Sequence, residues 1–474
     1  LQGHSNKEFD IDSERKKNEE FIANFVQNIN LEQMQPEDVL AEYLQPTELI
    51  IKWYAHDALV HLMSPHGLEQ YGGAAWGTRD VSQGPTELFL ALGYNEPVRE
   101  IIKIMYEHQF IENGNWPQWF MFDEYADQFA AESHGDIIVW PLKVVAEYLK
   151  QSHDITILNE PLSYMSLEDK QTTSKKEKLI DHIKRQLNYI TSHFLPHTFV
   201  SAYGDGDWDD TLQPANSEQK KTMASTWTQE LTIETLDLTS KVIAEFDEEF
   251  AREVFELKEK MKTDFRKYFM KDSVLPGFIS MDAENKPHYI IHPEDKVTKI
   301  NYRLLPLQQG ILSNIFNERE TQEALAIIKK NLLFPDGVRL MDRPATYQGG
   351  ISEIFKRAEQ SSFFGRETGL LYVHAHIRYA EALIECGYSK EAWKALLQIN
   401  PISLKKRVPN AALRQANTYF SSSDAAFNDR YQAQQNFAEL KKGEIPVKGG
   451  WRLYSSGPGI YVAALKKLLN YKKV

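Results

Sequence analysis

The chain has 474 residues, with 54 Lys and Arg against 67 Asp and Glu, so its formal net charge is −13 at pH 7. An acidic chain without a Lys/Arg-rich tract does not fit a nucleic-acid binder, whose affinity comes mainly from neutralising phosphates. No stretch reaches the roughly 18 apolar residues of a membrane span, and the single cysteine, Cys386, excludes a disulfide framework and a thiolate metal cluster. Many of the 22 Tyr, 24 Phe and 9 Trp adjoin Gly, Asp or Arg in loop-like stretches, which favours stacking on sugar rings.

The start of the chain is unusual, because Leu1 is not preceded by an initiator methionine and no basic and apolar regions of a signal peptide follow it. We therefore expect a fragment, a processed form or one piece of a longer polypeptide, located in the cytoplasm.

Apolar residues recur at spacings of three and four along most of the chain, which predicts helices with one buried face. Ile101, Ile104 and Met105 are an example. The expected helices are 14–29, 95–108, 137–150, 173–192, 228–246, 249–270, 319–331, 367–387 and 428–441. Strand-like alternation is confined to 288–291, 338–341 and 450–454. Polar loops rich in Gly and aromatic residues lie at 64–85, 112–136, 200–216, 336–366, 408–427 and 446–459.

Helices in pairs with such loops between them predict an all-α fold, an (α/α)6 barrel with short β-hairpins and with long loops lining its pocket. Binding residues are expected on these loops, because a rigid scaffold holds loops in place. Residues 1–45 are expected to be a helical lead-in. No Pro/Gly/Ser-rich linker divides the rest, so residues 46–474 are expected to form one barrel domain.

The loop 203–210 contains four aspartates within six residues, together with two glycines and a tryptophan. We expect it to lie outside the core, with the repulsion tolerated by solvent, by a metal or by a raised pKa on one carboxyl. A carboxyl kept protonated beside an aromatic wall suits a general acid acting on a glycosidic oxygen. The alternatives are a solvated acidic turn and a Ca²⁺ loop. The Ca²⁺ pattern is disfavoured because Asn216 stands where that loop needs Glu.

The loop 72–80 is rich in small residues and ends in Arg79 and Asp80. Small residues let a loop lie close to a ligand, and this pair could donate to and accept from vicinal hydroxyls. The alternative is a surface ion pair worth under about 1 kcal/mol.

Three further segments allow both a functional and a structural interpretation. Residues 113–123 contain four aromatic side chains, of which Phe120 and Phe122 are expected in the core. Asp136 of the His-Gly-Asp segment could simply cap the helix that follows it. The turn 454–459 suits an anion, although it lacks the lysine of a nucleotide-binding loop. Histidines 374 and 376 lie on opposite sides of a helix, which argues against a shared metal.

Five motifs in order, G-x-R-D, H-G-D, G-D-W-D-D, R-E-x-G-x-x-x-x-H and S-G-P-G, resemble family 94 of the glycoside hydrolases, which comprises the cellobiose, chitobiose and related β-glucan phosphorylases. The resemblance runs from about residue 50 to the C-terminus. The wording of 69–76 and 454–457 is most similar to the 1,2-β-oligoglucan phosphorylase branch of the family.

This resemblance implies inverting phosphorolysis of a β-linked gluco-oligosaccharide, with inorganic phosphate as co-substrate and with neither a metal nor another cofactor. Phosphate attacks the anomeric carbon directly, so one carboxylic acid suffices, where an inverting hydrolase needs a second carboxylate to activate water. The roles that the resemblance implies are the general acid for Asp210, the donor site for Arg79, Asp80 and Trp208, the acceptor site for Arg366 and Glu367, and phosphate binding for His374, Ser456 and Gly457.

Two departures from the family pattern bear on these roles. The family usually has Asn at the position of Asp209, so a second carboxyl here adjoins the acid, would help to raise its pKa and is a rival for its role. The family also continues R-D-x-x-Q with Asp, whereas Gln83 is followed by Gly84. This second departure suggests a different sugar linkage or chain length.

The expected partners are the oligosaccharide and phosphate, together with a second copy of the chain or the N-terminal β-sandwich domain that family members carry and this sequence lacks. One alternative function is an inverting β-glucan hydrolase with Asp80 or Glu367 as its base. A second is a non-catalytic glycan-binding domain, and a more remote one is an epimerase that uses His134 and His374.

Overall fold

The computed structural model describes residues 10–29, 31, 41–63, 75–270, 274–365, 367–369, 371–450 and 456–471. Its helices are α1 (Ile11–Phe25), α2 (Ala41–Met63), α3 (Thr78–Leu92), α4 (Asn95–Glu107), α5 (Trp140–Ser152), α6 (Leu179–Ser192), α7 (Ser217–Thr222), α8 (Thr226–Val242), α9 (Glu248–Tyr268), α10 (Leu304–Leu312), α11 (Glu318–Ile327), α12 (Lys356–Gln360), α13 (Val373–Glu385), α14 (Ser389–Ile399), α15 (Leu404–Arg407), α16 (Arg430–Lys441) and α17 (Ser456–Asn470).

The strands are short and antiparallel within the described residues. They pair as β1 (Trp76–Gly77) with β2 (Trp119–Phe120), β3 (Pro161–Met165) with β4 (Thr172–Lys178), β6 (Phe278–Met281) with both β5 (Met223–Ser225) and β7 (Pro287–Ile290), β8 (Leu333–Phe334) with β9 (Gly337–Val338), and β10 (Ser423–Ala425) with β11 (Val447–Gly449).

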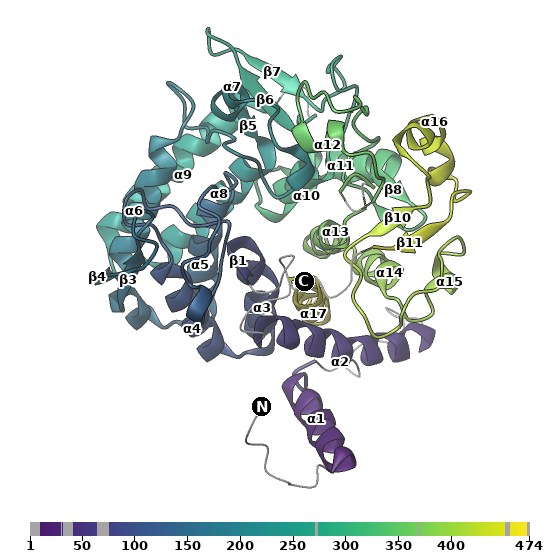
Figure 1. Ribbon diagram of the computed structural model, residues 1–474, viewed down its shortest axis with the longest axis horizontal. Coiled ribbons are helices and arrows are strands. Elements are labelled where there is room, and N and C mark those ends of the chain that lie inside the picture. Colours follow the sequence, from purple (N-terminus) through teal and green to yellow (C-terminus); the bar gives the residue numbers. More distant parts are fainter. Residues whose placement is uncertain are drawn as a thin grey trace.

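An inner ring of helices closes on itself around the centre of the molecule (Figure 1). Going around this ring, α3 packs against α5, α5 against α8, α8 against α10, α10 against α13, α13 against α17, and α17 against α3. The helices between them in sequence form an outer layer, in which α2 covers α17 and α3, α4 covers α3 and α5, α9 covers α8, and α14 covers α13. This alternation of inner and outer helices is an (α/α)6 barrel, and it confirms the predicted all-α fold.

Alternating helix faces explain the two layers. In the outer helix α4, the buried residues Val98, Ile101, Ile102 and Met105 follow the spacing of three and four that the sequence shows. The inner helices α3 and α17 close the ring at glycines, because a Cβ at residue 84 would lie 2.2 Å from the Ser456 Cα and one at residue 459 would lie 2.1 Å from the Gly84 carbonyl oxygen. Because these glycines have no side chains, α3 and α17 can pack closely side by side and close the ring.

Several predicted segments differ from the structure; the loop predicted over 446–459, for example, ends before Ser456, where α17 begins. Residues 173–178 belong to the strand β4 rather than to a helix, since they pair with β3 and the helix α6 begins only at Leu179. The last part of the predicted loop 64–85 is helical, because α3 begins at Thr78. The helix predicted over 367–387 begins at Val373, since residues 367–369 form a turn.

Two further predictions concern the end of the lead-in at residue 45 and the strand over 450–454. The helix α2 passes through residue 45, where the sequence suggests that a lead-in ends, and it packs as an outer helix of the barrel. Most of the strand predicted over 450–454 lies outside the described residues. Among the helices that the structure describes, none is both long and apolar enough to cross a membrane.

Candidate active site

The residues that the sequence singles out meet at one end of the barrel, where the inner helices begin. Arg79 and Asp80 lie in the first turn of α3, His374 lies in the first turn of α13, and Ser456 and Gly457 begin α17. The loop that carries Trp208, Asp209 and Asp210 contacts the same end. The N-terminal ends of helices carry a partial positive charge and free N–H groups, so this end of the barrel favours an anion.

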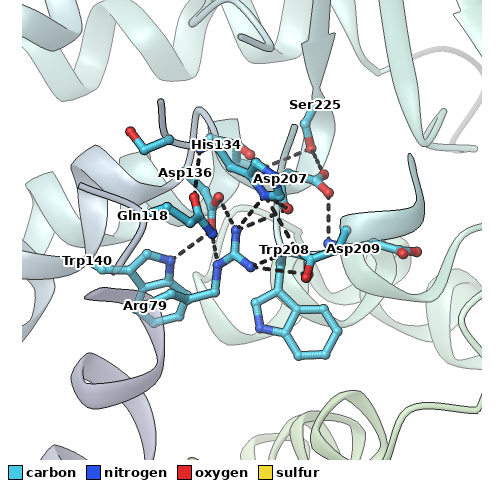
Figure 2. Close-up of polar contacts among 12 residues, drawn as sticks. Arg79, Gln118, His134, Asp136, Trp140, Asp207, Trp208, Asp209 and Ser225 are labelled. Carbon is cyan, nitrogen blue, oxygen red and sulfur yellow. Dashed lines mark hydrogen bonds and ion pairs between the residues drawn. The ribbon is translucent and has the colours of Figure 1, made fainter. Parts of the chain in front are cut away.

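Arg79 is the centre of a buried cluster (Figure 2). Its Nε and Nη2 donate to the two carboxylate oxygens of Asp136, at 2.8 and 2.7 Å. Its Nη2 also lies 3.1 Å from the Asp207 carbonyl oxygen and 3.1 Å from the His134 Nδ1, and its Nη1 lies 3.3 Å from the Asp210 Oδ1. The interpretation of Arg79 and Asp80 as a surface ion pair is therefore wrong, because Arg79 is buried and forms its bidentate pair with Asp136.

Asp136 has no exposed surface, and it does not cap the helical turn that follows it. Instead its Oδ2 accepts from the Trp140 Nε1 at 2.8 Å in addition to Arg79. The capping interpretation is wrong because the side chain turns towards the first turn of α3. Asp136 thereby fixes the guanidinium that contacts the loop 207–210.

A second buried ion pair holds the acidic loop from its other side. The Arg303 Nη1 and Nη2 donate to the two carboxylate oxygens of Asp207 at 2.8 and 2.9 Å, and the Ser225 hydroxyl donates to Asp207 at 2.6 Å. Burial opposes ionisation of Asp207, but the attraction of Arg303 and these hydrogen bonds hold its pKa below the ordinary value. The expectation that this loop lies outside the core is wrong for Asp207 and Asp209, which are both fully buried.

Asp209 points away from Arg79 (Figure 2) and begins the short helical turn 210–212. Its Oδ1 accepts from the Thr211 N–H at 3.2 Å and from the Thr211 hydroxyl at 2.6 Å. Its Oδ2 is buried and has no hydrogen-bond partner within the described part of the chain. Burial raises the pKa of Asp209 to about 7, although Arg303 attracts its charged form. The repulsion within the loop is thus reduced by the raised pKa of Asp209 and by the pairing of Asp207 with Arg303.

The raised pKa of Asp209 predicts that Asp209→Asn increases the free energy of unfolding, and that the increase is larger at higher pH. The ordinary pKa of 3.8 applies to the unfolded chain and the value of about 7 to the folded one, so the folded state binds the extra proton and loses stability as the pH rises towards 7. Asparagine keeps the acceptor for Thr211 and has no charge. We expect its gain over the wild type to be larger at pH 8 than at pH 5, by on the order of 2–3 kcal/mol, as measured by denaturant unfolding.

The control for this prediction is Asp205→Asn, which removes a half-buried aspartate of the same loop that pairs with Lys220. An Asp209→Asn gain that is equal at both pH values would contradict the assignment of the proton to Asp209.

Asp210 differs from its neighbours because its side chain retains 29% of its exposure. Its Oδ1 lies 3.3 Å from the Arg79 Nη1 and 3.4 Å from the His134 Nδ1. His134 is itself held, since its backbone N–H donates to the Gln118 Oε1 at 2.9 Å and its Nε2 lies 3.2 Å from the Gln213 Nε2. Asp210 is therefore the aspartate of the loop whose side chain both reaches solvent and contacts the buried Arg79 cluster.

Trp208 directs its ring away from the Arg79 cluster (Figure 2). The ring packs edge-to-face on Tyr372, with 4.8 Å between the centroids. It also lines a cavity of about 320 Å³ inside the barrel, to which Trp140, Trp227 and the inner helices contribute. Trp208 thus lies between the loop 203–210 and this cavity.

His374, Ser456 and Asp80 are brought into one hydrogen-bonded chain. The His374 Nε2 lies 2.7 Å from the Ser456 Oγ, and the Ser456 hydroxyl lies 3.2 Å from the Asp80 Oδ1. The His374 Nδ1 lies 2.7 Å from the Tyr419 hydroxyl. His376 has a structural role and is not part of this hydrogen-bonded chain. Its two ring nitrogens bond to backbone groups, and burial lowers its pKa to about 4.

The remaining predicted residues fall in the segment before α13. Arg366 lies outside the described residues. Glu367 is buried, and its charge contributes to raising the pKa of Asp209, so the two carboxyls lie near each other. The turn that carries Glu367 is held by Arg339, whose Nη1 donates to the Gly369 carbonyl at 2.7 Å. Gly84, where the family has Asp, abuts the Ser456 backbone, so a larger residue does not fit there.

Sequence reasoning missed several residues that shape this end of the barrel: Gln118, Ser225, Arg303, Tyr372 and Tyr419. Tyr372 lies within the R-E-x-G-x-x-x-x-H motif at one of its unspecified positions, and the other four lie outside the five motifs. A usable signal was the number of charges in the loop 203–210, because a buried carboxylate needs a cation. Among the described residues, no group of three or more His, Cys, Asp or Glu side chains is placed to hold a metal ion.

Solved structures share this fold at low sequence identity. A glycosidase in complex with glucose superposes with a TM-score of 0.54 and 10% identity, covering 91% of this chain and 99% of its own. A bacterial glucoamylase complexed with acarbose gives a TM-score of 0.51 and 10% identity, covering 89% of this chain and 56% of its own. These similarities define the fold as a helical barrel. At 10% identity they do not assign a role to any residue.

The family follows from the sequence itself. The family description "Glycosyl hydrolase 94 superfamily, catalytic domain" matches residues 105–434, which is more than half of the chain. The chain belongs to this superfamily, as the resemblance of its motifs predicted.

Two named relatives are similar to this chain. A 1,2-beta-oligoglucan phosphorylase of Listeria innocua serovar 6a is 53% identical over 420 residues, which cover 88% of this chain and 38% of that protein. A solabiose phosphorylase of Paenibacillus borealis is 28% identical over 169 residues, which cover 35% of this chain and 19% of that protein. The chain thus spans well under half the length of these relatives.

Proposed function

We propose that this chain is the catalytic domain of a glycoside phosphorylase that cleaves β-linked gluco-oligosaccharides with inorganic phosphate. The substrate that we propose in particular is a β-1,2-glucan oligosaccharide. The 53% identity to the Listeria 1,2-beta-oligoglucan phosphorylase carries the proposal. The site supports it, because a partly exposed carboxyl, Asp210, and the chain His374–Ser456 meet at the same end of the barrel.

The reaction requires one bond to form and one to break. A phosphate oxygen attacks the anomeric carbon, the glycosidic C–O bond breaks, and Asp210 gives its proton to the leaving oxygen. The β-linkage thereby becomes α-glucose 1-phosphate, and the remaining saccharide leaves with a free hydroxyl. Asp210 acts as the only acid, since phosphate is already a nucleophile and needs no base to activate it.

Each end of the proposed site suits its part of the substrate. The phosphate is expected at His374, Ser456 and Gly457, where α13 and α17 begin and their N-termini favour an anion. The reacting glucose is expected against Trp208, with Asp80 accepting from its hydroxyls. The saccharide that leaves is expected towards Glu367 and Arg366. The overall acidity of the chain makes such local donors necessary for anion binding.

The experiment that tests this function is phosphorolysis of sophoro-oligosaccharides with and without phosphate. We expect turnover only with phosphate, and α-glucose 1-phosphate as the product by ¹H NMR. Equal sugar release in phosphate-free buffer would identify a hydrolase instead. Tight oligosaccharide binding without turnover, unchanged in Asp210→Asn, would indicate a non-catalytic binding domain.

The linkage is tested in the reverse direction. With α-glucose 1-phosphate as donor, a panel of β-1,2-, β-1,3- and β-1,4-linked disaccharide acceptors is compared by phosphate release. We expect sophorose, the β-1,2-linked disaccharide, to be the best acceptor. A faster rate with a β-1,3- or β-1,4-linked acceptor would contradict the proposed linkage.

A further inference from the structure

A chain of three hydrogen bonds connects Tyr419 to Asp80 through the first turns of α13 and α17. The Tyr419 hydroxyl lies 2.7 Å from the His374 Nδ1, the His374 Nε2 lies 2.7 Å from the Ser456 Oγ, and the Ser456 hydroxyl lies 3.2 Å from the Asp80 Oδ1. Tyr419, His374 and Ser456 are all buried. Water therefore does not substitute easily for any of these bonds.

The chemistry of the four groups fixes the direction of this chain. A carboxylate only accepts, so the Ser456 hydroxyl must donate to Asp80. A hydroxyl has one hydrogen, so the Ser456 Oγ accepts from His374, and the proton of the neutral imidazole lies on Nε2. The His374 Nδ1 is then an acceptor, and Tyr419 must donate to it. Burial raises the pKa of Tyr419 well above its ordinary value, which keeps this phenol protonated.

We propose that Tyr419 is a positioning residue that holds His374 in the tautomer with its proton on Nε2. This inference rests on the proposed function, in which His374 and Ser456 bind phosphate. With the Nε2 hydrogen donated to the Ser456 Oγ, the hydrogen of the Ser456 hydroxyl stays directed outward, to Asp80 or to a phosphate oxygen, whereas in the other tautomer Nε2 would accept that hydrogen and withdraw it from the anion. Tyr419 thus sets the phosphate affinity without contacting phosphate.

The packing around Tyr419 supports this role. A Cβ at residue 457 would lie 2.0 Å from the Tyr419 Cζ, so the ring occupies the space that a side chain at Gly457 would need. Tyr54 contacts the ring edge-to-face, with 5.6 Å between the centroids. The phenol is therefore held on the phosphate side of α17, and the change Tyr419→Phe removes its hydroxyl while keeping the ring.

The test compares Tyr419→Phe with Tyr461→Phe in the full chain. Tyr461 is a buried tyrosine whose ring packs on Tyr54 and lies outside the hydrogen-bonded chain. We expect Tyr419→Phe to raise the KM for phosphate about tenfold or more, with little change in the KM for the oligosaccharide or in the unfolding temperature. Tyr461→Phe should leave both KM values near those of the wild type. A KM for phosphate in Tyr419→Phe within about twofold of the wild type would overturn the proposal.

Calorimetric titration with inorganic phosphate separates this inference from the proposed function. If the wild type binds phosphate but shows no phosphorolysis, the proposed function fails, and a weaker Kd in Tyr419→Phe alone still supports the positioning role. If the wild type does not bind phosphate, both fail.

A second pair of variants decides the question if Tyr419→Phe does not fold. The amide nitrogen of His374→Gln reaches the position of Nε2, and that of His374→Asn reaches the position of Nδ1. We expect the glutamine variant to bind phosphate more tightly than the asparagine variant. The opposite order would assign the useful N–H to Nδ1 and overturn the proposal.

Discussion

Asp210→Asn is expected to lower the kcat for phosphorolysis of a β-linked oligosaccharide by about 10²- to 10⁴-fold, because the leaving oxygen then receives no proton. Asparagine has nearly the same shape, and its amide oxygen can still accept from the Arg79 Nη1, which lies 3.3 Å from the Asp210 Oδ1. The loss should therefore be one of chemistry rather than of folding, and the unfolding temperature should change little. Steady-state phosphorolysis of sophorotriose measures it.

A substrate whose leaving group needs no proton separates the role of Asp210 from a general loss of the site. With β-glucosyl fluoride and phosphate, Asp210→Asn should recover most of the wild-type rate. The matched variant is Asp209→Asn, which changes the adjacent carboxyl in the same way. If Asp209→Asn causes the larger loss on sophorotriose and is the variant that the fluoride rescues, Asp209 is the acid and the assignment to Asp210 is wrong.

The contrast between these two aspartates shows what sequence reasoning could reach. The motif places a pair of carboxyls beside Trp208, and the structure separates their environments. Asp210 is partly exposed beside Arg79, while Asp209 is fully buried with a raised pKa. Burial depends on contacts far along the chain, so the sequence could identify the pair but not the difference between its members.

The fold shows the same division between local and distant information. The amphipathic helix α4 was predicted almost to the residue because its buried positions follow a helical period. The helix α10 was missed because apolar residues occupy several of its sides, as in Leu304, Leu305 and Leu307, and a helix buried all round lacks that period. Residues 173–178 form a strand because they pair with β3, and the local sequence pattern does not show this pairing. The sequence therefore predicted a helix there.

Arg303 is a residue that local sequence could not reveal. It precedes α10 and pairs with an aspartate 96 residues earlier in the chain. Its charge also attracts the buried carboxyls of Asp209 and Glu230. Both carboxylate oxygens of Glu230 have no hydrogen-bond partner within the described residues, and burial raises its pKa well above the ordinary value. Arg303 thus keeps Asp207 ionised, and it opposes without overcoming the effect of burial on Asp209 and Glu230.

Arg303→Met is therefore expected to destabilise the protein by about 3–5 kcal/mol at neutral pH, because it leaves Asp207 as a buried and unpaired charge. The pKa of Asp207 lies below its ordinary value in the folded wild type, so the stability from this pair is present above that ordinary value and is lost as the pH falls through the folded pKa. The difference between variant and wild type should accordingly shrink in acid. Urea unfolding at neutral and acidic pH measures both effects.

The double variant Arg303→Met with Asp207→Asn tests whether charge is the cause. It replaces the ion pair with neutral groups, so it should be less destabilised than the sum of the two single variants. Asp207 also accepts from the Asp209 N–H at 3.0 Å, and its carbonyl accepts from Arg79 at 3.1 Å, so the pair also holds the segment that carries Asp210. We therefore expect the double variant to regain stability but not full kcat. Additive losses would instead mean that the packing of Arg303 on Phe278, 4.4 Å from the ring centroid, supplies its contribution.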